Sequence, residues 1–108
     1  MRGFFRMDYA RQGGAGGTVV FTDGNVAGWD TGGGFFRGRY DDDGQAVVGE
    51  LTMDFPNGGT LVNGDAVPKG AAPLRLPFRI DDPARAESIR LETPTGPVAV
   101  KLTRVSAL

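Results

Sequence analysis

Carboxylates are the residues of this chain with the clearest chemical potential. Asp41, Asp42 and Asp43 are consecutive, and adjacent carboxylates can attract a basic patch on a partner protein or supply oxygen ligands to Ca²⁺. Glu50 and Asp54 are spaced to share one face of a strand, where they could pair as general acid and base. We expect them instead to be ordinary exposed carboxylates on the outside of the strand. The chain has no histidine and no cysteine, so the usual general base and thiolate chemistry are absent. These residue types favour a binding protein over an enzyme, and we expect no cofactor.

Two interpretations of the acidic segment stay open. Asp43-Gly44 is a typical hairpin signal, and aspartate is favoured in turns because its side chain bonds the local backbone. The spacing of an EF-hand loop is missing, so we expect no metal site. Asp41, Asp42 and Asp43 are therefore either residues of a solvated turn or the contact point for a protein partner.

The segment Gly28-Trp29-Asp30-Thr31 also has two interpretations. Trp29 is the single tryptophan, and tryptophan is enriched at the energetic centres of protein interfaces, so the segment could form a specific surface. Alternatively it is a structural corner, in which Asp30 caps a turn and Trp29 plugs one end of a barrel. We expect the structural corner.

Large apolar residues recur at every second position of several segments, which is typical of half-buried strands. Those expected to face a common interior include Phe5, Phe36, Tyr40, Met53 and Phe78. An eight-stranded barrel is just wide enough either to be filled by such side chains or to hold one small ligand. These five residues are therefore the possible lining of a pocket for an apolar ligand, and we expect a filled or nearly filled core.

Arginines occupy the opposite, outward positions of the same strands: Arg37, Arg39, Arg75, Arg79 and Arg90. On adjacent strands they could form a basic stripe for phosphate or nucleic acid. The net charge is −1, however, from 12 basic and 13 acidic residues, which indicates no broad attraction to nucleic acid or to an anionic membrane. We expect a solvated face and no direct binding of nucleic acid.

The elements that must position these residues are short strands joined by glycine-rich turns. The chain has 108 residues, 18 of them glycine, and we count eight or nine strands at intervals of about ten residues, a spacing typical of a sandwich or barrel. We predict one domain, 1–108, with an all-β fold: a small antiparallel eight-stranded barrel or curved meander. Residues 56–73 are expected to form a short hairpin with loops, and Pro77 predicts an edge or a bulge in its strand. No segment is long and apolar enough for a membrane span, so we expect a cytoplasmic protein.

The order of motifs in residues 3–55 resembles the GrlR family, named for a negative regulator of type III secretion. The resemblance begins with Gly3-Phe4-Phe5, Gly16-Gly17-Thr18-Val19-Val20-Phe21 and Asp23-Gly24-Asn25-Val26. It continues in Gly28-Trp29-Asp30-Thr31 and Phe35-Phe36-Arg37-Gly38-Arg39-Tyr40, and beyond Phe55 only the strand pattern remains. The resemblance covers about half of the chain.

Membership of this family would imply a lipocalin-like barrel that forms a homodimer and binds a transcriptional activator. It would also imply a regulatory role for an exposed acidic segment, at whose place this chain has Asp41-Asp42-Asp43-Gly44. From the residues and the resemblance we expect a non-enzymatic binding protein that acts by contact with a regulatory partner. The alternative is a lipocalin-like carrier of a small apolar ligand.

Overall fold

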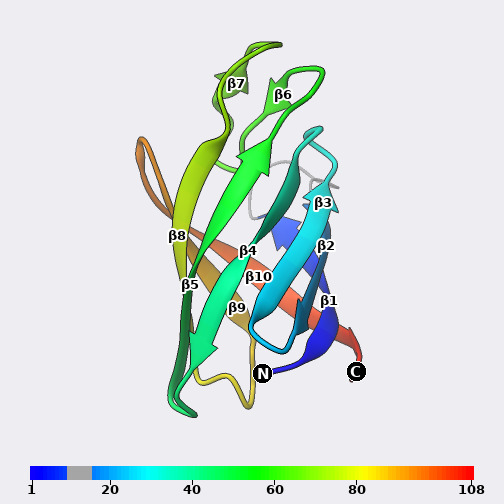
Figure 1. The fold of residues 1–108 in the computed structure, drawn as a ribbon, viewed down its shortest axis with the longest axis vertical. Helices are drawn as coiled ribbons and strands as arrows, with labels where there is room; N and C mark the ends of the chain where they lie inside the picture. The colour runs from blue at the N-terminus through cyan, green and yellow to red at the C-terminus, as the bar shows by residue number, and fades with distance from the viewer. Residues whose placement is uncertain (10–15) are drawn as a thin grey trace.

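The computed structural model describes residues 1–9 and 16–108 and shows a closed antiparallel β-barrel (Figure 1). The strands are β1 (Gly3–Tyr9), β2 (Gly16–Thr22), β3 (Asn25–Asp30), β4 (Phe35–Asp42), β5 (Ala46–Asp54), β6 (Gly59–Thr60), β7 (Ala66–Val67), β8 (Leu74–Asp81), β9 (Ser88–Thr93) and β10 (Gly96–Ser106). Around the barrel the order is β1-β10-β9-β8-β5-β4-β3-β2, so eight strands form the wall. The predicted all-β, eight-stranded barrel is confirmed.

The two remaining strands, β6 and β7, pair with each other in an excursion beyond one end of the barrel (Figure 1). Leu61 and Val62, which follow β6, are buried at 3% and 2% exposure. Asn63 Nδ2 donates to Thr93 Oγ1 at 3.0 Å, which ties the excursion to the end of β9. The predicted hairpin within residues 56–73 is therefore present, and it covers this end of the barrel.

The core consists of the side chains that alternate inward along each strand. Phe21 lies at its centre, with its ring edge-on to the rings of Phe5, Tyr40 and Phe78 at centroid distances of 5.7, 5.4 and 6.3 Å. Such edge-to-face arrangements are favoured because the positive ring edge meets the negative ring face. Phe5 and Phe21 are both 0% exposed. The interior between them is filled by side chains.

The wall has one short seam, between β8 and β9. β8 pairs with β5 from Leu74 to Asp81, but β9 pairs with it only at Phe78 and Arg79. The pairing with β9 stops next to Pro77, which has no N–H to donate. The prediction that Pro77 marks an edge or a bulge is wrong, because β8 lies between β9 and β5 in the closed barrel and its register with β5 runs through Pro77 without a shift. The proline instead marks the limit of the ladder with β9.

Candidate functional site

The corner between β3 and β4 has a polar inner side built on Asp30. The Asp30 side chain is 3% exposed, and its Oδ1 accepts hydrogen bonds from the Gly32 and Gly34 N–H groups at 3.1 and 3.0 Å. Tyr9 OH donates to Asp30 Oδ2 at 2.8 Å. Burial, and then the negative charge of Asp30, raise the pKa of Tyr9 well above its usual range. The interpretation of Asp30 as the cap of a turn agrees with these bonds.

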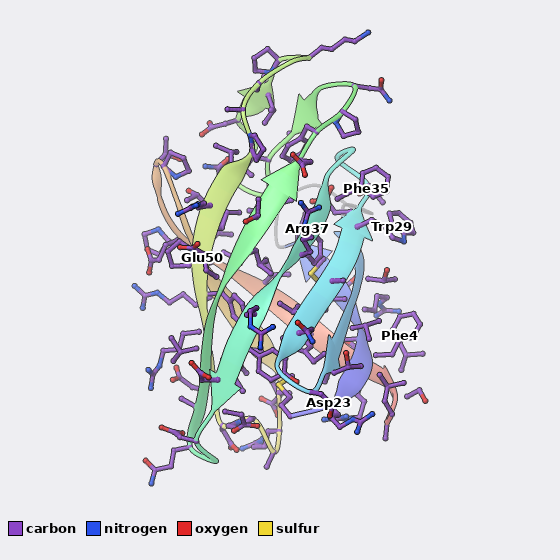
Figure 2. All side chains as sticks on the ribbon, in the orientation of Figure 1. Phe4, Asp23, Trp29, Phe35, Arg37 and Glu50 are labelled. Atoms are coloured by element: carbon purple, nitrogen blue, oxygen red, sulfur yellow. The ribbon has the colours of Figure 1, made fainter. Side chains whose placement is uncertain are left out.

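The outer side of the same corner is aromatic. Trp29 is 49% exposed and Phe35 is 58% exposed. They are directly opposite each other in the β3–β4 ladder, and both point away from the barrel (Figure 2). The expectation that Trp29 plugs the barrel end is wrong. Gly28 faces the interior, and because successive residues of a strand face opposite sides, Trp29 faces outward. A Cβ on Gly28 would overlap the Thr18 carbonyl oxygen and lie 2.6 Å from Phe36 Cζ, so the Phe36 ring occupies the space above this glycine.

Neighbouring apolar residues extend this surface across β1 to β4. Phe4 pairs with Val20, and Val20 pairs with Ala27, which precedes Trp29 by two positions on the same face of β3. Figure 2 shows Phe4 on the same side of the barrel as Trp29 and Phe35. We call these five residues, Phe4, Val20, Ala27, Trp29 and Phe35, the outer aromatic face. The predictions from the sequence did not include this surface, although the outward phase of the strand alternation is the signal for it.

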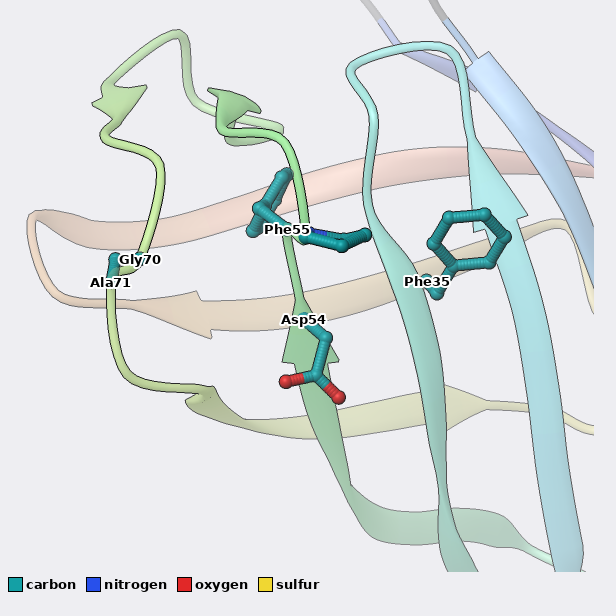
Figure 3. A pocket seen from close by; sticks show the side chains of 6 residues that line it. Phe35, Asp54, Phe55, Gly70 and Ala71 are labelled. Carbon is teal, nitrogen blue, oxygen red and sulfur yellow. The ribbon is translucent and has the colours of Figure 1, made fainter.

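A groove continues from the outer aromatic face toward the excursion (Figure 3). It has a volume of about 400 Å³ and is lined by Phe35, Asp54, Phe55, Pro56, Gly70 and Ala71. Phe35 and Asp54 are brought together because they are directly opposite in the β4–β5 ladder. Asp54 Oδ2 lies 3.9 Å from Arg37 Nη1, at the outer limit of an ion pair. The groove thus combines an exposed ring with a carboxylate that is only loosely paired.

The acidic turn is largely bonded within the chain. Asp42 pairs with the N-terminal ammonium of Met1 and accepts a hydrogen bond from the Gly44 N–H at 2.8 Å. Asp43 Oδ1 accepts from the Gln45 and Ala46 N–H groups at 2.8 and 2.9 Å. The hydrogen bond from the ammonium, and after it the one from Gly44, hold the pKa of Asp42 below its usual range. The hydrogen bonds from Ala46 and Gln45 lower the pKa of Asp43 in the same way. Asp41 is exposed, and contact of the turn with a partner stays a prediction.

The outward arginines are matched by acceptors, and most of these are carboxylates. Arg79 Nε lies 2.7 Å from Asp81 Oδ1, and Arg90 Nε lies 3.4 Å from Glu92 Oε1, each two positions along the same strand. Arg75 is 4.0 Å from Glu50, Arg37 approaches Asp54, and Arg39 donates to Asn25 Oδ1 at 3.1 Å. Because each positive charge lies beside an acceptor, which in most cases is negative, the arginines do not form a continuous basic stripe. The arrangement is that of a solvated charged face.

The carboxylate pair considered for acid–base chemistry is widely separated. Glu50 and Asp54 are four residues apart on one strand, which corresponds to about 13 Å at the rise of an antiparallel strand. Each lies beside a different arginine, and their side chains are 51% and 41% exposed. Two carboxylates that flank one reacting bond lie closer together than this. They do not form one site.

The five residues predicted to line the interior do lie there. Phe5, Phe36, Tyr40, Met53 and Phe78 are between 0% and 7% exposed. A cavity of about 10 Å³ lies at the Tyr9–Asp30 end of the interior, with Val62 of the excursion among the residues that line it. A space of this size holds one water molecule at most. The geometry agrees with the expected filled core.

No family model, no curated protein and no solved structure matches this chain. In the described ranges, 1–9 and 16–108, no helix has the length and apolar character needed to cross a membrane.

Proposed function

We propose that this chain is a non-enzymatic cytoplasmic binding protein, resembling the GrlR-type negative regulators, which acts by contact with a regulatory protein. The observation that carries the proposal is the outer aromatic face. Trp29 and Phe35 are 49% and 58% exposed and lie directly opposite each other on the outer wall of the barrel.

Exposed aromatic residues have a physical reason to mark an interface. Burying apolar surface contributes roughly 25 cal/mol per Å², and aromatic side chains supply large areas for few rotatable bonds. Tryptophan and tyrosine dominate the energetic centres of protein interfaces, and phenylalanine is enriched there as well. A contiguous apolar patch on an otherwise polar wall is typical of a contact surface.

The filled interior supports this proposal over the carrier of a small apolar ligand. Sites for small molecules occupy roughly 300–1,000 Å³ and enclose most of the ligand. The cavity within this barrel measures about 10 Å³. A carrier would have to displace core side chains such as Met53 or Leu91, each of which is at most 5% exposed.

A homodimer is the second assembly that the outer aromatic face would support. A two-fold interface buries the same patch on both copies, so the patch with Phe4, Trp29 and Phe35 would pack against the same patch of the second copy. Sedimentation of the purified chain distinguishes this assembly from a complex with another protein. A concentration-dependent dimer that Trp29→Ser dissociates would assign the face to self-association.

The test is native mass spectrometry of the tagged chain recovered gently from its own cells. We expect a second polypeptide with the wild type, its loss in the double variant Trp29→Ser, Phe35→Ser, and its retention in Val48→Ser. Val48 is a matched control because it is 49% exposed on the outer face of β5, away from the outer aromatic face. A small-molecule adduct in place of a polypeptide would instead support the carrier.

A further inference from the structure

We propose that the groove beside Phe35 binds an arginine side chain of the partner protein, with its guanidinium over the Phe35 ring and paired to Asp54. This inference rests on the proposed function, because it names the chemistry that the partner presents to this surface. It concerns the groove lined by Phe35, Asp54, Phe55, Pro56, Gly70 and Ala71 (Figure 3).

The first support is the loose pairing of Asp54. Three outward carboxylates lie close to an arginine two positions away, at 3.0 Å for Asp8, 2.7 Å for Asp81 and 2.9 Å for Glu87. Glu50 is as loosely paired as Asp54, at 4.0 Å from Arg75, but it does not line the groove. Asp54 lies 3.9 Å from Arg37, whose side chain is 78% exposed. A carboxylate oxygen accepts several hydrogen bonds, so Asp54 retains capacity for an incoming donor.

The second support is the Phe35 ring. At 58% exposure it presents a large part of its surface to solvent on the wall of the groove. A cation over the face of an aromatic ring is attracted by the ring quadrupole, and arginine is the cation most often found there. Because Phe35 and Asp54 are directly opposed in the β4–β5 ladder and both line the groove, we infer that one guanidinium can contact both.

The third support is the shape and rigidity of the other wall. Pro56 and Ala71 give an apolar surface for the aliphatic stem of a long side chain. Turn hydrogen bonds hold this wall in place, from the Gly58 N–H to the Phe55 carbonyl at 3.0 Å and from the Ala71 N–H to the Pro68 carbonyl at 3.2 Å. A preformed wall lowers the entropy lost on binding.

Arginine fits this groove better than lysine. The planar guanidinium stacks on a ring and donates two parallel hydrogen bonds to a carboxylate, whereas the ammonium of lysine is a compact and strongly hydrated charge. Asp54 would repel an acidic segment, and a neutral segment would leave it with only its loose pair to Arg37. The expected partner segment is therefore basic and contains at least one arginine.

The experiment uses the blocked tripeptide Gly-Arg-Gly and its analogue with citrulline, which has nearly the same shape but no charge. Amide shifts of the intact chain, measured by two-dimensional NMR, report where each probe binds. We expect shifts at Phe35, Asp54 and Ala71 with the arginine probe. We expect binding of the citrulline probe to be about three- to thirtyfold weaker, because it lacks the ion pair and the cation–ring contact.

Two variants complete the test. Asp54→Asn should remove the preference for arginine over citrulline, and the matched control Asp81→Asn should keep it, because Asp81 lies on β8 outside the groove. Equal binding of the two probes, or a preference that survives Asp54→Asn, would overturn the inference.

The failure of this inference can be told apart from failure of the proposed function. If Trp29→Ser, Phe35→Ser releases the cellular partner but the arginine probe does not bind the groove, the binding function stands and the arginine site is wrong. If the double variant keeps the partner, the outer aromatic face is not the contact surface, and the proposal for its groove fails with it.

Discussion

The inner and outer sides of the β3–β4 corner show how differently two neighbouring residues can be used. Asp30 is buried and bonded to Tyr9, Gly32 and Gly34 within the chain. Trp29, one position earlier, is 49% exposed on the opposite face of the same strand. The acidic turn resembles the inner side in one respect: Asp42 and Asp43 also accept hydrogen bonds from the backbone of their own chain. Bonded polar groups stabilise the fold, whereas the exposed aromatics are available for contact with another molecule.

The largest expected effect follows from removing the inner side of the corner. Asp30→Ala leaves the buried N–H of Gly34 and the partly buried donors of Tyr9 and Gly32 without their acceptor, and we expect it to lower the free energy of unfolding by about 3 kcal/mol. Urea denaturation followed by circular dichroism measures this change. Asp81→Ala, in an exposed surface pair, should change it by about 0.5 kcal/mol or less. Equal effects of the two variants would contradict the distinction between the buried corner and the surface.

The next effect concerns the outer side and should appear in binding. Phe35→Ser is expected to weaken the complex with the partner by about thirtyfold or more, as expected for an aromatic residue at an energetic centre. Its free energy of unfolding should change little, because the ring is 58% exposed. Calorimetric titration with the isolated partner, alongside urea denaturation, checks both. A large loss of stability with unchanged affinity would reverse the roles of the two sides.

A smaller effect is a pH dependence at the inner side. The pKa of Tyr9 is raised in the folded chain, so its contribution to stability is complete below the unfolded value of about 10 and is lost as the pH rises above it. Tyr9→Phe should cost about 1.5 kcal/mol at pH 7, through the lost bond to Asp30, and should flatten the decline of stability above pH 10. Urea denaturation at pH 7, 9 and 10.5 measures this slope. An unchanged slope in the variant would assign the alkaline decline to other groups.

The smallest effect is expected at the acidic turn. Asp42→Asn combined with Asp43→Asn should slightly lower the Tm at pH 7 and reduce affinity for the partner less than Phe35→Ser does. Because both pKa values are lowered in the folded chain, their contribution is present above about pH 4 and is lost as the pH falls further. Thermal unfolding at pH 7 and pH 3 should therefore show the difference from the wild type shrinking at the lower pH. A clear loss of affinity would instead support the turn as the contact point.

Much of this fold was predictable because strand alternation is a local signal. The period of two placed Phe5, Phe36 and Phe78 in the interior, and the turn preference of aspartate indicated Asp30 as a cap. The same alternation turns Trp29 outward after the inward Gly28. The prediction that Trp29 plugs the barrel end was wrong because Trp29 lies in the outward phase of β3.

The groove could not be predicted from the sequence. Phe35 and Asp54 meet through the register of the β4–β5 ladder, and Gly70 and Ala71 reach them only because the excursion folds back along the barrel. The bond between Tyr9 and Asp30 likewise joins residues 21 positions apart. Such contacts depend on the register between strands and on the path of the excursion, and alternation within single strands carries no information about them.

The most direct test of the outer aromatic face uses its single tryptophan. Incorporation of 5-fluorotryptophan places one fluorine in the chain, at Trp29, and its ¹⁹F resonance responds to solvent exposure. On formation of the complex, we predict a shifted resonance that no longer moves when H₂O is replaced by D₂O. An unchanged, solvent-sensitive resonance in a complex whose formation native mass spectrometry has established would contradict the central claim that this face binds the partner.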